Sequence, residues 1–105
     1  MDLRISGIDW DQGNRAKCQQ HGLTIPEIEH VLLHAQHLIV RDVRNSIAED
    51  RYIAIGKSRI GRFAFLVFTL RRSGDGLKVR PISARYMHKK EVAKYEEEIA
   101  RLQNR

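Results

Sequence analysis

The stretch Lys78-Val79-Arg80-Pro81-Ile82-Ser83-Ala84-Arg85 decides how this chain is organised. It predicts the last strand of a sheet, leads directly into a closing helix and ends on an arginine. Basic charge gathers around it, because residues 51–90 hold eleven Lys or Arg side chains against one acidic residue, a net charge of +10. Residues 1–50 carry a net charge of −3, and residues 91–105 carry −1. The basicity therefore lies on the predicted sheet and on the turn into the last helix.

Length and composition predict one globular domain spanning 1–105. The single cysteine, Cys18, cannot form an internal disulfide and has no evident activating partner, so we expect an ordinary thiol. No apolar run approaches the ~20 residues of a membrane span. The first residues lack the apolar core of a signal peptide. We therefore expect a soluble, cytoplasmic protein without a membrane partner.

The charge balance indicates the kind of partner. A sequence pI near 9.9 favours a polyanion, because clustered Lys and Arg displace counterions from phosphates. The alternative is a solvated basic surface. Segregation of the charge into one part of the chain favours the polyanion.

Capping residues and apolar periodicity predict three helices. Asp11 fits the N-cap of a helix over about 12–20, and Gly22 fits its C′ position. Thr24 opens a capping-box pattern and an amphipathic helix over 25–35. The last helix covers 88–102, with Val92, Tyr95, Ile99 and Leu102 on one face.

The remaining apolar segments predict strands. Pro81 lacks an N–H, so its strand must be unpaired or bulged there. Residues 5–10 form either an edge strand or a lead-in whose Trp10 covers the core. The strands are expected over 38–43, 51–56, 62–70 and 77–85, the third being apolar on both faces and therefore central. The chain is expected to be an α+β domain: two N-terminal helices, a three- to four-stranded antiparallel sheet and a C-terminal helix.

A series of short motifs resembles a known family in order and over nearly the whole chain. The motifs are Trp10-Asp11, His21-Gly22, Glu27, Asp50 to Gly56, Gly61-Arg62, Arg80 to Arg85, and Glu91 with Tyr95. This pattern resembles the BrnT family of bacterial toxins. Its most specific part is Ile82-Ser83-Ala84-Arg85 with Glu and Tyr downstream.

The resemblance implies a RelE-like ribonuclease fold and metal-independent RNA cleavage, with no cofactor. It also implies a BrnA-like antitoxin as partner, and contact with operator DNA only through the antitoxin complex. The family pattern has Asn and Lys four and one residues before the His of His-Gly. Here those positions are Lys17 and Gln20.

Metal-independent RNA cleavage needs a base for the 2′-hydroxyl, cations for the phosphorane and an acid for the leaving 5′-oxygen. Arg85 is the main candidate for the cationic role, because a guanidinium matches two phosphate oxygens. The alternative is that Arg85 pairs with Glu91 and fixes the last helix. Strict alternation puts Arg80 on the opposite face, unless a bulge at Pro81 intervenes.

Other basic side chains are candidates for RNA-backbone contacts. Lys57, Arg59 and Arg62 surround one predicted hairpin, which is otherwise a solvated loop. Lys89 and Lys90 lie at the N-terminus of the last helix, where the dipole disfavours cations. A docked anion would offset that penalty.

His21, Glu91, Tyr95 and His88 are candidates for proton transfer. His21 can be a base or an acid near neutral pH, or a cap for the preceding helix. Glu91 and Tyr95 lie one helical turn apart, although Tyr95 also lies on the apolar face. His88 can cap its helix or take part in proton transfer.

Glu27, His30 and His34 share one helical face and imitate metal-ligand spacing. No Cys or Asp accompanies them, so no metal site is expected. The resulting hypotheses are an RNA-cleaving toxin, a non-catalytic module that binds antitoxin and operator DNA, and a plain nucleic-acid-binding domain.

Overall fold

The computed structural model describes residues 5–34, 37–42, 49–74 and 76–103. Within these residues the elements follow one another as strand, two helices, four strands and a helix. Their bounds are β1 Ile5–Ile8, α1 Gln12–Cys18, α2 Ile25–Leu33, β2 His37–Arg41, β3 Tyr52–Lys57, β4 Phe63–Ser73, β5 Gly76–Tyr86 and α3 Lys89–Gln103.

The strands form one five-stranded sheet in the order β1-β5-β4-β3-β2. The predicted α+β class is confirmed, but the predicted three- to four-stranded antiparallel sheet is wrong. β1 adds a fifth strand, parallel to β5, with Ile5 opposite Leu77 and Ile8 opposite Val79. This pairing joins segments about 70 residues apart, so local sequence patterns do not predict it. Of the two possibilities for the first segment, the edge strand is confirmed.

β5 carries the bulge that Pro81 predicts. Val67 lies opposite Ser83 and Phe68 lies opposite Pro81, so the residue between them on β5 is extra. Arg80 and Arg85 are consequently paired with Thr69 and Phe65, which are four residues apart on β4 and share a face. The exception that a bulge at Pro81 allows is therefore the case, and strict alternation does not hold between Arg80 and Arg85.

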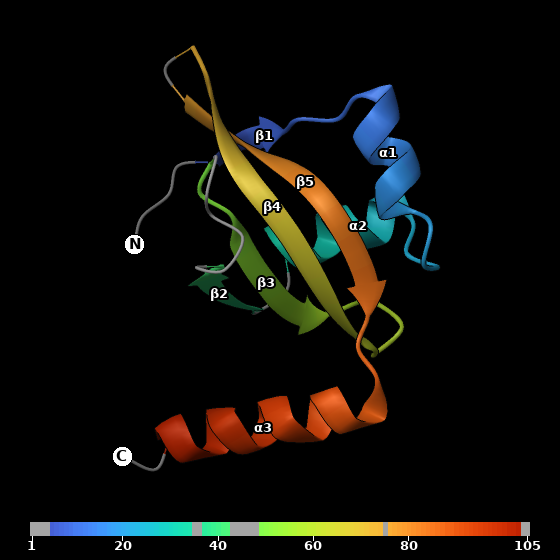
Figure 1. Cartoon of the computed structure of the whole chain (residues 1–105), viewed down its shortest axis with the longest axis vertical. Helices are drawn as coiled ribbons and strands as arrows, with labels where there is room; N and C mark the ends of the chain where they lie inside the picture. The colour runs from blue at the N-terminus through green and yellow to red at the C-terminus, as the bar shows by residue number, and fades with distance from the viewer. Residues whose placement is uncertain (1–4, 35–36, 43–48, 75, 104–105) are drawn as a thin grey trace.

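The core lies on the side of the sheet that α1 and α2 cover (Figure 1). Every second residue of β4 is buried toward these helices, namely Ala64, Leu66 and Phe68. The apolar residues on the other face of the strand are only partly buried. Cys18 is fully buried, and burial raises the pKa of its thiol. The core consists of Cys18, Leu23, Ile28, Val31, Ala54, Ala64, Leu66, Phe68, Val79 and Ala84.

The first helix begins as predicted and ends early. Asp11 caps it, because its side chain accepts from the backbone N of Asn14 while the Asn14 side chain accepts from the backbone N of Asp11. The helix ends at Cys18, two residues before the predicted end. Gly22 has a φ of 96°, but it lies four residues beyond that end and is not at C′.

The second helix has only half of the predicted capping box. Thr24 accepts from the backbone N of Glu27, as expected. The Glu27 side chain instead binds Arg59. The helix ends at Leu33, whereas residue 35 of the predicted span lies outside the described residues.

The other elements differ from prediction by one to three residues at their ends. Part of the predicted 38–43 strand and most of the turn after it lie outside the described residues. The turn between β4 and β5 is tight, with Ser73 paired to Gly76 and a φ of 59° at Gly74. No described helix is long and apolar enough to span a membrane.

The third helix lies apart from the other two and crosses below one end of the sheet (Figure 1). The ring of Tyr95 lies 5.3 Å from the ring of Phe63. Val92, Tyr95 and Ile99 are each only partly buried. The apolar face of α3 is therefore only partly covered.

Candidate active site

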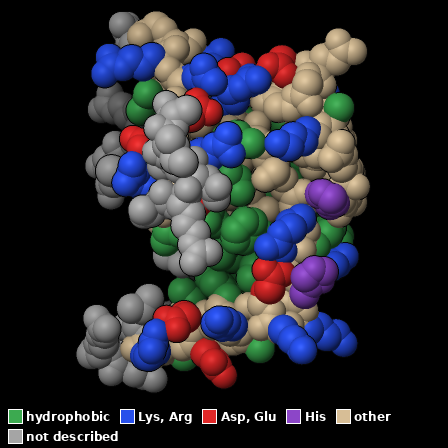
Figure 2. All heavy atoms as spheres, in the orientation of Figure 1, with side chains coloured by type: hydrophobic (Ala, Val, Ile, Leu, Met, Phe, Trp, Pro, Cys, Tyr) green, Lys and Arg blue, Asp and Glu red, His purple; other side chains and the backbone are tan. Residues whose placement is uncertain are grey.

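An open pocket lies where β5 ends and α3 begins. Three separate segments line it: the α1–α2 connection, the β3–β4 loop and the β5–α3 junction. Figure 2 shows histidine, basic and acidic side chains gathered on one side of the molecule, near the helix at the bottom of the view. The pocket residues are His21, Gly22, Ile60, Arg62, Arg85, Tyr86 and His88.

Arg85 is held by Glu91 in a two-point ion pair. Its Nη1 and Nη2 donate to Oε1 and Oε2 of Glu91, each at 2.8 Å. Its guanidinium also lies 4.5 Å from the centre of the Phe65 ring. The arrangement that fixes the last helix is therefore present, and the Arg85 side chain is still 37% exposed at the pocket.

Glu91 is ionised throughout the neutral range. Its Oε1 accepts from the backbone N of His88 at 3.0 Å, so it also caps the start of α3. The bonds from Arg85 and then from the His88 amide lower the pKa of Glu91 from 4.5 to about 2. A carboxylate with so low a pKa is a poor general base at neutral pH.

Arg62 lies on the other side of the pocket, stacked on an aromatic ring. Its guanidinium carbon lies 4.1 Å from the centre of the Tyr86 ring, and its side chain is exposed. A Cβ at Gly22 would lie 3.9 Å from that ring, so the His21-Gly22 backbone runs close to Tyr86. His21 is exposed beside it. The fold thus places two guanidinium groups and two histidines around one pocket.

The other predicted RNA-binding residues lie in varied surroundings. Arg59 is paired with Glu27 through its backbone N and Nε. Arg80 donates to Asp11 at 2.6 Å and to Asp9 at 3.4 Å, and it does not line the pocket. Among the described residues these two carboxylates are the acidic partners of Arg80, and through them Arg80 links β5 to the start of α1.

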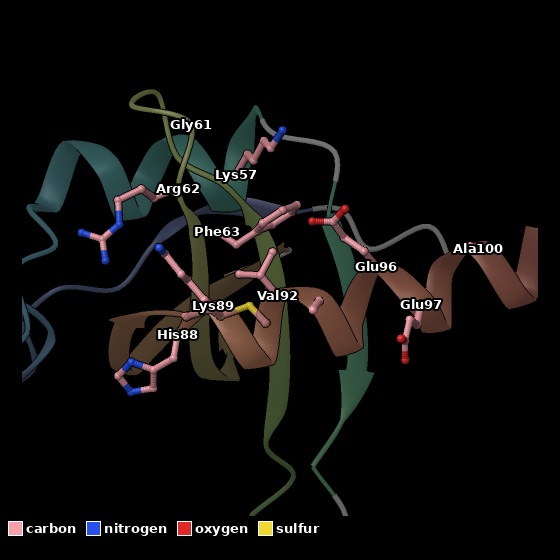
Figure 3. Close-up of a pocket in the computed structure, with 12 residues that line it drawn as sticks. Lys57, Gly61, Arg62, Phe63, His88, Lys89, Val92, Glu96, Glu97 and Ala100 are labelled. Atoms are coloured by element: carbon pink, nitrogen blue, oxygen red, sulfur yellow. The ribbon is translucent and has the colours of Figure 1, made fainter.

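A second groove runs beside the pocket along α3, and Figure 2 shows a hollow above that helix. Figure 3 shows Phe63 and Val92 facing one another in it, with Arg62, His88 and Lys89 at one end. Lys57 lies 5.4 Å from the centre of the Phe63 ring. The groove therefore continues the pocket along an apolar floor.

Of the remaining predicted residues, Lys90 is exposed next to Lys89 in the first turn of α3. Tyr95 packs on Phe63 and does not line the pocket, and burial raises its pKa. Its assignment to catalysis stays a prediction.

Glu27 and His30 lie on α2, as expected, but the Glu27 carboxylate is occupied by Arg59. Among the residues that the structure describes, no group of three His, Cys, Asp or Glu side chains could hold a metal ion.

Sequence reasoning missed the aromatic supports of the site. Phe65 lies under Arg85 and Tyr86 lies under Arg62. The adjacent pair Arg85-Tyr86 and the alternation Phe63-x-Phe65 were the only signals, and an apolar strand produces both without any site.

Comparison with protein families decides the classification. Residues 10–91 match the family described as ribonuclease toxin, BrnT, of type II toxin-antitoxin system. The chain belongs to the BrnT family. The match contains every residue of the pocket, from His21 to His88, and ends at Glu91. The resemblance to the BrnT family that the short motifs indicated is therefore confirmed. BrnT membership supports a ribonuclease toxin with an RNA substrate and a cognate antitoxin. A search of curated proteins found no match.

Proposed function

We propose that this chain is an endoribonuclease toxin that cleaves RNA without a metal, at the pocket between β5 and α3. The observation that supports it is the convergence of Arg85, Arg62, His21 and His88 on that pocket. Two guanidinium groups there can neutralise a phosphate in its pentacovalent state. Two imidazoles can supply the base and the acid.

Glu91 has a supporting role in this proposal. Its depressed pKa makes it unsuited to taking the 2′-hydroxyl proton at neutral pH. Its two bonds to Arg85 set the orientation of the guanidinium. Tyr95 remains a second candidate acid, one helical turn further along α3.

The RNA strand would continue from the pocket into the groove along α3. Lys57 and Lys89 line that groove, and Lys90 lies next to it. We assign these lysines to backbone phosphates. Arg59 and Arg80, each paired with a carboxylate, would contribute through the local field more than by direct contact.

We further infer that the fold is RelE-like and that the partner is a BrnA-like antitoxin, with operator DNA bound only by their complex. The site of action would be the cytoplasm. BrnT membership supports the antitoxin in general terms. Masking of the basic pocket is the simplest way for such a partner to inhibit.

One experiment tests the nuclease. The purified chain, freed of any partner, is incubated with RNA in EDTA, in parallel with Arg85→Ala and with Arg72→Ala as a matched control. Arg72 is an exposed arginine near the far end of β4 and does not line either groove. We expect wild type and Arg72→Ala to cleave and Arg85→Ala to lose at least a hundredfold in rate. Equal cleavage by Arg85→Ala would remove only the role of Arg85.

The Arg85–Glu91 pair also favours a second candidate, a non-catalytic module, because both terminal nitrogens of the key arginine already have partners. Intact RNA under all conditions, together with binding of the antitoxin, would establish that candidate. Binding of duplex DNA without any partner would instead indicate a plain nucleic-acid-binding domain.

A further inference from the structure

Glu27, near the start of α2, accepts hydrogen bonds with both of its carboxylate oxygens from a single residue of the β3–β4 loop. Its Oε2 accepts from the backbone N of Arg59 at 2.9 Å, and its Oε1 accepts from Arg59 Nε at 2.8 Å. Glu27 is 9% exposed. The backbone N–H of Arg59 is the main cause that lowers the pKa of Glu27, so the carboxylate is charged at neutral pH.

The loop that receives these bonds is internally closed. Ser58 N donates to Arg62 O at 2.8 Å, and Gly61 N donates to Ser58 O at 3.0 Å. Gly61 has a φ of 82°, a conformation that favours glycine. A fixed backbone at Arg59 therefore fixes the backbone of Arg62, which begins the return into β4.

Arg62 is the loop residue that reaches the pocket as a cation, stacked on Tyr86. The loop is thus held at two points, by Glu27 on one side and by Tyr86 on the other. Arg59, in contrast, directs its Nε at Glu27 and does not line the pocket.

We propose that Glu27 is a positioning residue for RNA binding: it holds the 58–62 loop so that Arg62 presents its guanidinium to an RNA phosphate. This inference rests on the proposed function. It assigns the Glu27–Arg59 contact to substrate recognition, although that contact lies outside the pocket.

Glu27→Gln tests the proposal. Glutamine keeps the size of the side chain, but it has only one acceptor oxygen. Its NH₂ group would face one of the two Arg59 donors, so it cannot accept both hydrogen bonds. We expect the Kd for a short single-stranded RNA, measured with cleavage blocked by a 2′-deoxy nucleotide at the scissile position, to rise about tenfold, as for one lost phosphate contact. The slope of log K against log salt should fall by about 0.7.

Glu29→Gln is the matched control. It makes the same change two residues later on α2, where Glu29 Oε2 accepts from Trp10 Nε1 at 3.2 Å, away from the loop. We expect its RNA affinity and salt slope to equal those of wild type. Arg59→Ala serves as a second variant, because its exposed side chain can be removed while the backbone N–H to Glu27 remains. We expect a smaller loss of RNA affinity than for Glu27→Gln, because the backbone bond to Glu27 is kept.

A double-mutant cycle with Arg62→Ala separates positioning from a general structural role. If Glu27 acts through Arg62, Glu27→Gln adds nothing to Arg62→Ala. Additive losses, or an unchanged salt slope, would overturn the proposal. Backbone amide relaxation of residues 58–62 in the free protein gives a readout without RNA, and we expect order parameters below about 0.6 in Glu27→Gln. A rigid loop in that variant would sink the proposal, whereas wild type that binds no RNA would refute the proposed function itself.

Discussion

Replacing Glu91 by glutamine separates two effects of the Arg85–Glu91 pair: its contribution to stability, and its proposed competition with an RNA phosphate for Arg85. The change removes the negative charge and keeps the size of the side chain. One remaining oxygen can still accept from Arg85, but the bidentate, charge-assisted pair is lost. We expect the folded state to be less stable and Arg85 to be more available to a phosphate.

The magnitude follows from the pKa of Glu91. A fall of this pKa from 4.5 to about 2 would correspond to roughly 3 kcal/mol of stability if the ion pair were fully buried away from water. Both side chains are about a third exposed, at 37% and 33%, so solvent screening reduces the effect to about 1 kcal/mol. For a domain of this size the midpoint of thermal unfolding should fall by roughly 5 °C.

Two measurements on the same variant test this reasoning. Thermal unfolding by circular dichroism gives the stability, and fluorescence anisotropy with a non-cleavable RNA gives the affinity. We expect a lower midpoint together with RNA binding that is about threefold tighter, because the phosphate no longer competes with a carboxylate. Glu98→Gln, an exposed position on the same helix that lines neither groove, should change neither.

One result would refute the account. If Glu91→Gln bound RNA as well as wild type but cleaved it a hundredfold more slowly, Glu91 would take part in proton transfer. Its role as a support for Arg85 alone would then be wrong.

Three further predictions concern stability. The pKa of Glu91 is lowered, so the contribution of the Arg85–Glu91 pair to stability is complete above pH 4.5 and is lost as the pH falls toward about 2. The free energies of unfolding of wild type and Glu91→Gln, measured by acid unfolding, should converge there. Gly76→Ala should cost about 1 to 3 kcal/mol in urea unfolding, because its Cβ would lie 2.9 Å from the Ser6 side chain, and Ser6→Gly should relieve the loss. Asn14→Ala should cost about 2 to 3 kcal/mol by the same assay, because its buried side chain makes three hydrogen bonds; a loss below 0.5 kcal/mol would contradict that reading.

Local chemistry explains most of what could be predicted. Asp11 and Thr24 cap their helices as expected, since a cap depends on residues within one turn. Pro81 predicted its bulge, because a missing N–H acts wherever the strand is placed. Pairing of β1 with β5 was not predicted, because it depends on which distant edge remains available after the antiparallel strands have paired.

The same distinction applies to the site. Arg85 and Glu91 are six residues apart, and their pairing was among the alternatives. Glu27 and Arg59 are 32 residues apart, and the capping-box spacing suggested a nearer partner for the carboxylate. Arg80 was assigned to RNA, but the carboxylates of Asp9 and Asp11 come to it from the other end of the chain.

The parallel contact between β1 and β5 also has a consequence for synthesis. A ribosome makes Ile5–Ile8 first, yet this strand has nothing to pair with until Leu77–Val79 has emerged. The β3–β4 hairpin can form earlier, because its partners are close in sequence. Closure of the sheet at β1 therefore waits for β5, and Arg85 emerges after the residues that pair with β1. The pocket that Arg85 lines is thus completed only after the whole of β5 has been synthesised.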